Sequence, residues 1–380
     1  MRRITSFVCA GAMLAWAAHS SRTVLATASL CSGALGQSGW LCETVDAAGD
    51  VGSLNHSIYG PDGAVHVAYT ANIQLQGLKY KTALKYARRN NAGTWTTQIV
   101  DGSVGGAQGM LINPVTGQPA IGYGCLKFAE WIGTAWSLQT VVKDCGDSAA
   151  TFAFDPAGTV FAAYSDKRTW RLNVGKRTGS TWSFQMLLPE ASYMSMAVAA
   201  DGFPAIAFEN RANALVYGHQ QPGGSWQFTT VDTATTLIAR VTLRFTDTGS
   251  PAIAYRVDNS IRLGTQNALT GAWSVETIHT LPPGNTIDGV SLAFATGEPV
   301  VTFGATPDST RVLTFTAARR VTGSASWSLA SLEIMPGAML MSARADYNPG
   351  TGLIGVSYGP RGSSWNDLKF AEGPPGVIVP

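Results

Sequence analysis

A tryptophan-marked repeat constrains the fold of this chain more than any other feature. Seven tryptophans share one local pattern: Trp40, Trp95, Trp136, Trp182, Trp226, Trp273 and Trp327. Each is followed five residues later by an aliphatic side chain: Val45, Val100, Val141, Leu187, Val231, Ile278 and Leu332. The mean step from Trp95 to Trp327 is about 46 residues, a length typical of repeat architectures. The chain is therefore expected to fold as a series of similar units.

Each unit contains four short apolar segments separated by turn residues. The second segment ends in an aromatic residue, as in Pro-Ala-Ile-Ala-Tyr ending at Tyr255. The other copies end at Tyr69, Tyr123, Tyr164, Phe208, Phe303 and Tyr358. A turn such as Asp155-Pro156-Ala157-Gly158 precedes this segment, because Pro presets φ and Gly accepts a positive φ. Four antiparallel strands in about 46 residues predict one blade of a β-propeller.

The order of the segments predicts how the ring closes. The first Trp segment, residues 39–46, precedes any complete unit, and the last unit, 343–371, has no Trp segment after it. We therefore expect the N-terminal strand to complete the C-terminal blade. The predicted fold is an all-β, seven-bladed propeller of four-stranded blades, with repeats over about 38–373 in one domain of residues 29–380. Six complete blades with frayed ends are the alternative.

Charged residues are few, at 13% of the chain, which is about half the usual share. Propeller blades pack face to face, so most strands are covered on both sides and have little room for charge. The formal net charge is only +2, which excludes a strongly basic nucleic-acid binder. No nucleic-acid partner is expected.

The N-terminus has the pattern of a secretory signal peptide. Arg2 and Arg3 precede an apolar stretch over residues 4–18, and Ala26-Thr27-Ala28 offers small residues for cleavage. A membrane anchor is the alternative, but the stretch is shorter than the roughly 20 residues that a span needs. We expect residues 1–28 to be a signal peptide and the remainder to be a soluble monomer. It would be secreted, periplasmic or at the cell surface.

The four cysteines beyond that segment predict two disulfides, since exported chains meet oxidising conditions. Cys125 and Cys145 flank a predicted hairpin whose ends lie side by side, within the roughly 4.4–6.8 Å Cα range that a disulfide needs. Cys31 and Cys42 would then pair by elimination.

The Pro-Ala-Ile-Ala-Tyr, Leu-Lys-Tyr-Ala and Trp-x-x-x-x-Val-Asp segments resemble those of exported bacterial propeller-repeat proteins. That group is loosely related to the sialidase-like and lectin-like propellers. The resemblance covers nearly all of residues 38–373. It implies a fold and leaves the function open, because propellers host many unrelated activities.

Several catalytic chemistries can be weighed from the residues. Sialidase-like propellers often carry an Asp five residues before the repeat Trp, and none of the six internal positions is Asp: Asn90, Trp131, Arg177, Gln221, Ala268 and Thr322. An arginine triad could come from Arg211, Arg240, Arg244, Arg256 and Arg344, although scattered arginines are usually solvated or paired. The carboxylate pair of a glycosidase cannot be recognised from spacing across blades. The histidines are spread over different units, so no metal or other cofactor is expected.

Features outside the repeat suggest a binding face. Trp170 and Trp365 fall in the loops after the second segments of their units. The same class of loop carries six charged residues: Asp166, Glu209, Arg211, Arg256, Asp258 and Arg361. An exposed indole beside charged groups suits a sugar or a peptide, because the ring stacks and the polar groups orient the ligand. The alternative is that each Trp only caps a blade edge.

These residues predict an exported, non-enzymatic binding module. The expected partner is a glycan or a cell-surface protein, held by loops on one face. A glycan-acting hydrolase, sialidase-like or with two carboxylates, is the alternative. A scaffold that mediates only protein contacts is the third possibility.

Overall fold

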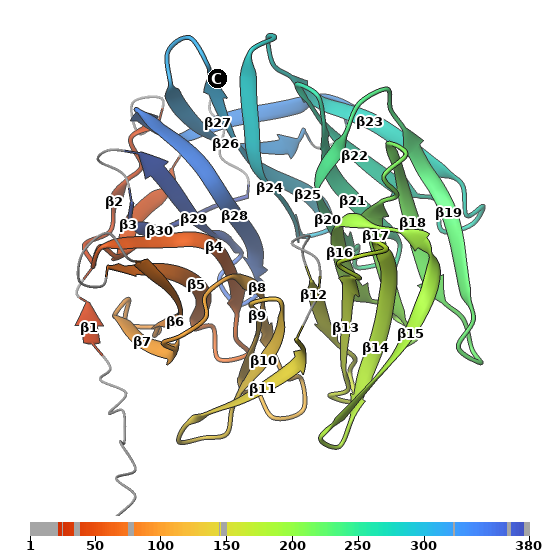
Figure 1. The fold of residues 1–380 in the computed structure, drawn as a ribbon. Helices are drawn as coiled ribbons and strands as arrows, with labels where there is room; N and C mark the ends of the chain where they lie inside the picture. The colour runs from red at the N-terminus through yellow and green to blue at the C-terminus, as the bar shows by residue number, and fades with distance from the viewer. Residues whose placement is uncertain are drawn as a thin grey trace, which may run out of the picture.

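The computed structural model describes residues 22–24, 26–33, 39–74, 80–143, 145, 150–321, 324–362 and 366–375. The strands of this part of the chain form seven antiparallel sheets arranged around a central axis (Figure 1). The predicted seven-bladed propeller is therefore confirmed. Most of the predicted signal peptide, residues 1–21 and 25, lies outside the described residues and stays a prediction.

Each of the first six blades contains four consecutive strands, ordered from the axis outward. Blades one and two comprise β4 (Asp50–Tyr59), β5 (Val65–Gln74), β6 (Tyr80–Arg89) and β7 (Trp95–Asp101), then β8 (Ala107–Ile112), β9 (Pro119–Tyr123), β10 (Leu126–Trp131) and β11 (Trp136–Val142). Blades three and four comprise β12 (Thr151–Phe154), β13 (Val160–Ser165), β14 (Arg171–Thr178) and β15 (Thr181–Glu190), then β16 (Ser192–Val198), β17 (Pro204–Glu209), β18 (Ala214–Gln220) and β19 (Trp226–Thr233).

The remaining blades follow the same plan. Blades five and six comprise β20 (Ile238–Phe245), β21 (Pro251–Val257), β22 (Ser260–Gln266) and β23 (Trp273–Thr280), then β24 (Asn285–Ala295), β25 (Glu298–Pro307), β26 (Val312–Arg320) and β27 (Trp327–Pro336). Blade seven contains β28 (Ala338–Asn348), β29 (Leu353–Gly362), β30 (Leu368–Gly373) and β3 (Leu41–Asp46). The inner strands β4, β8, β12, β16, β20, β24 and β28 contact one another around the axis.

The two ends of the chain close the ring. β3 pairs antiparallel with β30, with Cys42 opposite Ala371, as the order of the segments predicted. Two further strands were not anticipated. β2 (Ser29–Leu30) pairs with β3, and β1 (Arg22–Val24) pairs with β7 so that Val24 lies opposite Trp95. β1 falls inside the segment predicted as a signal peptide, so the site of cleavage decides whether an exported chain keeps it.

The apolar core lies in layers between neighbouring blades. Trp95 of blade one is fully buried and packs edge-on against Phe370 of blade seven, with 5.6 Å between the ring centroids. Because each such layer covers a blade face, the strands carry little charge, as the composition suggested.

Hydrogen bonds between polar side chains join neighbouring blades outside the apolar layers. Asp232 at the end of blade four accepts a 2.6 Å hydrogen bond from the hydroxyl of Tyr255 and a 2.9 Å bond from Arg262, both in blade five. Asp46 accepts a 2.6 Å bond from Tyr69 of the next blade in the same way. The Asp of the Val-Asp dipeptide and the Tyr that ends the second strand are thus explained by structure alone.

Both predicted disulfides are confirmed. Cys125 and Cys145 are bonded with their Cα atoms 5.6 Å apart, and Cys31 and Cys42 with theirs 4.9 Å apart. Within the described residues, no helix has the length and apolar character needed to cross a membrane.

Candidate ligand site in the central channel

A cavity of about 1400 Å³ occupies the space between the inner strands. Trp170, Glu209 and Arg211 lie at one end, on the face formed by the loops between the second and third strands of each blade. Asp155 and Asp247, in the turns between the first and second strands, lie at the other end. The cavity is therefore a channel that runs between the two faces of the propeller.

Three of the predicted binding residues line this channel: Trp170, Glu209 and Arg211. Four others are not in its lining: Asp166, Arg256, Asp258 and Arg361. Trp365 lies outside the described residues, so its role stays a prediction. The structure thus brings together part of the predicted set, all from blades three and four.

Asp166 shapes the turn that presents Trp170. Its Oδ1 accepts hydrogen bonds of 2.8 Å from both the amide and the hydroxyl of Thr169, and the Trp170 amide donates to the Asp166 carbonyl at 2.8 Å. These bonds from Thr169 lower the pKa of the Asp166 carboxyl. Trp170 itself has a φ of 58°, a conformation that costs energy for a residue with a Cβ. The turn holds the indole at the mouth of the channel.

Arg211 stacks on this indole. Its Cζ lies 4.2 Å from the ring centroid of Trp170, and its Nε lies 3.6 Å from a carboxylate oxygen of Glu190. Glu209, only 1% exposed, accepts hydrogen bonds from the Ser192 hydroxyl and, at 3.1 Å, from the amide of Asn213. Glu209 therefore fixes the loop that carries Arg211. The mouth combines a fixed aromatic surface with charged donors and acceptors.

The predicted residues outside the lining have contacts of their own. Arg256 donates to the carbonyl of Ile287 in the next blade at 2.9 Å. Arg361 of blade seven lies 3.7 Å from a carboxylate oxygen of Asp50 in blade one. Asp258 occupies the tight turn between β21 and β22 with a φ of 49°. Arg256 and Arg361 therefore join neighbouring blades, and Asp258 forms a turn.

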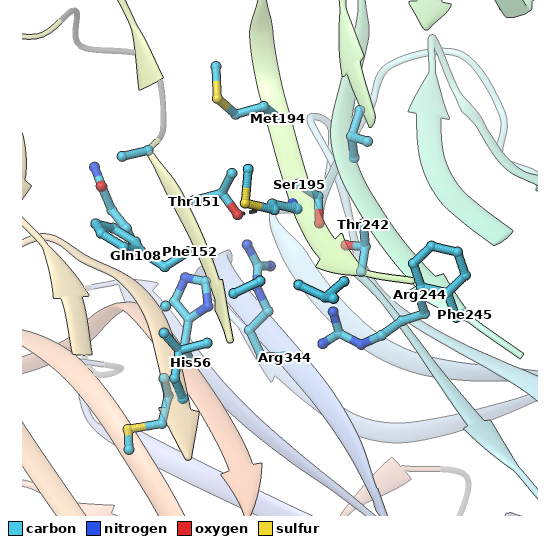
Figure 2. A pocket seen from close by; sticks show the side chains of 18 of the residues that line it. His56, Gln108, Thr151, Phe152, Met194, Ser195, Thr242, Arg244, Phe245 and Arg344 are labelled. Carbon is cyan, nitrogen blue, oxygen red and sulfur yellow. Dashed lines mark hydrogen bonds between the residues drawn. The ribbon is translucent and has the colours of Figure 1, made fainter. Parts of the chain in front are cut away.

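A second polar group lines the channel on the inner strands. Figure 2 shows the imidazole of His56 and the guanidinium groups of Arg244 and Arg344 directed into the enclosed space. Asp346, two residues after Arg344 on the same strand, also lines the channel. In the sequence, the two arginines are only two of five scattered candidates, and His56 and Asp346 belong to no motif. Aligning the first strands of the units against each other would have identified all four.

Burial controls the ionisation of this second polar group. It lowers the pKa of Arg344 to about 10, with further lowering by the nearby charges of Arg244 and Arg240. It lowers the pKa of His56 well below the ordinary value, and Arg344 and Arg244 add to the effect, so His56 is neutral at pH 7. Burial also raises the pKa of Asp346. The centre of the channel therefore holds two cationic guanidinium groups around a neutral imidazole.

In the part of the chain that the structure describes, no group of three His, Cys, Asp or Glu side chains is placed to hold a metal ion.

Comparisons with known proteins show a likeness of fold. A scan of protein-family models and a search of curated proteins found no match. Among solved structures, a six-bladed fucose-recognising lectin of Aleuria aurantia is 12% identical, with a TM-score of 0.50 over 77% of this chain and 97% of that one. A mutant of AofleA from Arthrobotrys oligospora is 15% identical, with a TM-score of 0.51 over 80% of this chain and 92% of that one.

The NanB sialidase of Streptococcus pneumoniae is 11% identical, with a TM-score of 0.48 over 87% of this chain and 70% of that one. At these identities the likeness concerns fold alone, so the function has to be argued from the channel itself.

Proposed function

We propose that this protein is a non-enzymatic, carbohydrate-binding propeller that takes its ligand at the channel mouth marked by Trp170. The observation that carries the proposal is the pairing of Trp170 with Arg211, 4.2 Å from ring centroid to Cζ, at the edge of a cavity of about 1400 Å³. A sugar ring packs its C–H face on an indole, while nearby charged and amide groups accept and donate hydrogen bonds to its hydroxyls.

The backbone strain at the channel mouth supports a role for these residues beyond folding. Three residues there have left-handed backbone conformations without being glycine, namely Trp170, Arg211 and Asn213, with φ of 58°, 60° and 60°. Such strain is typical of binding sites, where the surrounding structure holds a side chain in place. The proposed export fits the two disulfides, which form and persist in oxidising compartments. The fucose-recognising lectin shows that a related ring can serve sugar binding.

A glycan array probed with the purified protein tests the proposal, followed by titration of the best glycan against Trp170→Ala. We expect at least a several-fold loss of affinity, since a stacked aromatic contributes about 1 kcal/mol beyond its buried area. Trp327→Ala is the matched control. Trp327 also carries a stacked arginine, Arg320 with its Cζ 5.4 Å from the centroid, but it lies on an outer strand away from the channel.

The control variant should bind as the parent does, even if it melts earlier. Normal binding by Trp170→Ala, or loss of binding only after changes at the Asp155 end of the channel, would show that the ligand site lies elsewhere.

One observation favours the hydrolase alternative. Burial raises the pKa of Asp346, as a general acid requires. Its Oδ2 nevertheless accepts a 2.8 Å hydrogen bond from the amide of Tyr59, which gives the carboxylate a structural task. Incubating the array glycans with the protein and measuring new reducing ends decides between the two. Cleavage that is lost in Asp346→Asn would replace the binding proposal with hydrolysis.

A further inference from the structure

The inner strands place one residue of each blade at the same level of the channel. Each of these residues pairs with the residue just before the aromatic that ends the second strand. In chain order they are His56, Gly109, Thr151, Ser195, Thr242, Ser291 and Arg344. Five are small, four of these are hydroxyl residues, and two are basic.

The hydroxyl residues of this ring have a structural task. Thr151 accepts a hydrogen bond from the Met196 amide at 3.1 Å, and Ser291 accepts one from the Ala345 amide at 2.9 Å. Ser195 accepts a bond from the Leu243 amide at 3.0 Å, whereas the Thr242 hydroxyl donates to the Val290 carbonyl at 3.1 Å. A short hydroxyl at this level therefore fastens four of the inner strands to the next one.

Arg344 does not perform that task. At the junction of blades seven and one, the hydroxyl of Ser57 donates to the Arg344 carbonyl at 2.9 Å. The backbone amide of Asn55 donates to the Ser342 hydroxyl oxygen, also at 2.9 Å. The junction is fastened by other residues, so the Arg344 side chain is not needed there.

A second ring of residues lies two positions further along each inner strand, and two of its members differ in type from the other five. Its members are Ile58, Leu111, Ala153, Ala197, Arg244, Ala293 and Asp346. Five are apolar, as packing between blades requires. Arg244 and Asp346 break the pattern, and the charge of Arg244 adds to the lowering of the Arg344 pKa by burial. The departures from the repeat thus gather in one part of the channel.

Neither arginine forms an ion pair among the described residues, although the charge of Asp346 acts to raise the pKa of Arg244 against the effect of burial. One guanidinium nitrogen of Arg344 donates to the carbonyl of Ala343 at 2.9 Å, and one of Arg244 to that of Leu243 at 3.2 Å. Nearby Arg240, by contrast, pairs with Asp288 at 2.6 Å. A guanidinium has five N–H donors, so several on each arginine remain directed at the channel. Keeping two like charges together in a half-buried space costs stability unless an anion sits between them.

We propose that Arg244 and Arg344 form an oxyanion-binding site in the channel, with His56 as a further hydrogen-bonding group. The site takes a carboxylate, sulfate or phosphate group, because a planar guanidinium matches two oxygens of such a group at once. The inference rests on the proposed function in one respect only: the molecule that carries the carboxylate, sulfate or phosphate group is then an acidic glycan.

Calorimetric titration of the full protein with sodium sulfate, glucuronate and glucose tests the site. Sulfate and glucuronate should bind the parent, and glucose should not compete with them. Arg344→Gln and Arg244→Gln should each weaken anion binding by at least roughly tenfold, since a charge-assisted hydrogen bond is lost. Arg177→Gln is the matched control, because Arg177 is already held by two bonds to Glu130, at 2.9 and 3.1 Å. It should leave anion binding unchanged.

Thermal stability separates a binding role from a structural one. In anion-free buffer, Arg344→Gln should melt at or above the temperature of the parent, because it removes an unpaired charge from beside Arg244. A clear fall in the melting temperature would show that Arg344 has a structural partner and would overturn the inference.

The titration also distinguishes the two proposals. Sulfate binding that depends on Arg344, together with a blank glycan array, would support the oxyanion site and reject glycan binding. Array hits restricted to neutral sugars, with no sulfate or glucuronate binding, would reject the oxyanion site and leave the Trp170 proposal standing. Variants that bind sulfate as tightly as the parent would also overturn the site.

Discussion

Asp101 offers the sharpest test of how the blades are joined. It ends β7 of blade one, and its Oδ2 lies 3.1 Å from both the hydroxyl of Tyr123 and the amine of Lys127 in blade two. Its Oδ1 accepts bonds from the amide and the hydroxyl of Ser103, at 2.9 and 2.6 Å. The side chain is only 7% exposed. Asp101→Asn keeps the shape and removes the charge.

The size of the effect follows from the pKa of the carboxyl. Burial acts to raise this pKa, but the hydrogen bonds from Ser103 and the charge and hydrogen bond of Lys127 outweigh it and lower the value from 3.8 to about 2. A lowering of this size corresponds to about 2 kcal/mol of folding stability. Because the folded pKa is lowered, this stability is complete above about pH 5 and is lost as the pH falls toward 2.

The assay is denaturant unfolding of the parent and of Asp101→Asn at pH 7 and at pH 2.5. We expect the variant to be less stable by about 2 kcal/mol at pH 7, and the difference to shrink to roughly 1 kcal/mol at pH 2.5. The exposed residue Asp308 supplies the control, since Asp308→Asn should change little at either pH. The reasoning would be refuted by an Asp101→Asn protein that is as stable as the parent at pH 7, or by a stability difference that does not depend on pH. Either result would show that the Asp101 carboxylate does not stabilise the junction of blades one and two.

Three further predictions concern the ends and the cross-links of the ring. Deleting residues 39–46 removes the strand that completes blade seven, so a large fall in melting temperature with aggregation is expected; melting like the parent would argue against closure by β3. Replacing Cys125 and Cys145 by Ser should cost about 3 kcal/mol by the chain-entropy model, measured by unfolding under non-reducing conditions; unchanged stability would contradict it. Mass spectrometry of exported protein should find an N-terminus between residues 19 and 32, and an intact Met1 would exclude cleavage.

The repeat made the fold predictable from sequence. Trp95 and its six counterparts recur once per blade because each lies at or next to the start of a blade's fourth strand, and blades of similar size pack around one axis. The offset between the first Trp segment and the last unit was enough to predict closure by β3, since an open ring would leave strand edges bare. Cys125 and Cys145 were also predictable, because they flank a hairpin.

The mouth of the channel was predicted only in part. Trp170 and Arg211 stood out because the repeat does not require them, and the structure places them together. Arg256 and Arg361 stood out equally, yet their side chains join blades. An irregular residue in a loop has the same appearance in sequence whether it meets a ligand, a neighbouring blade or water.

What the sequence determined by itself is the architecture: strand order, blade number and ring closure, which depend on local patterns of apolar and turn residues repeated along the chain. What only the tertiary structure decided is which polar residues face the channel together. His56, Arg244 and Arg344 come from blades one, five and seven, and they meet because the ring closes, bringing β4 beside β28 and directing the inner strands at one axis. That no carboxylate of the described residues forms an ion pair with either arginine depends on distances across that axis, which no spacing along the chain records.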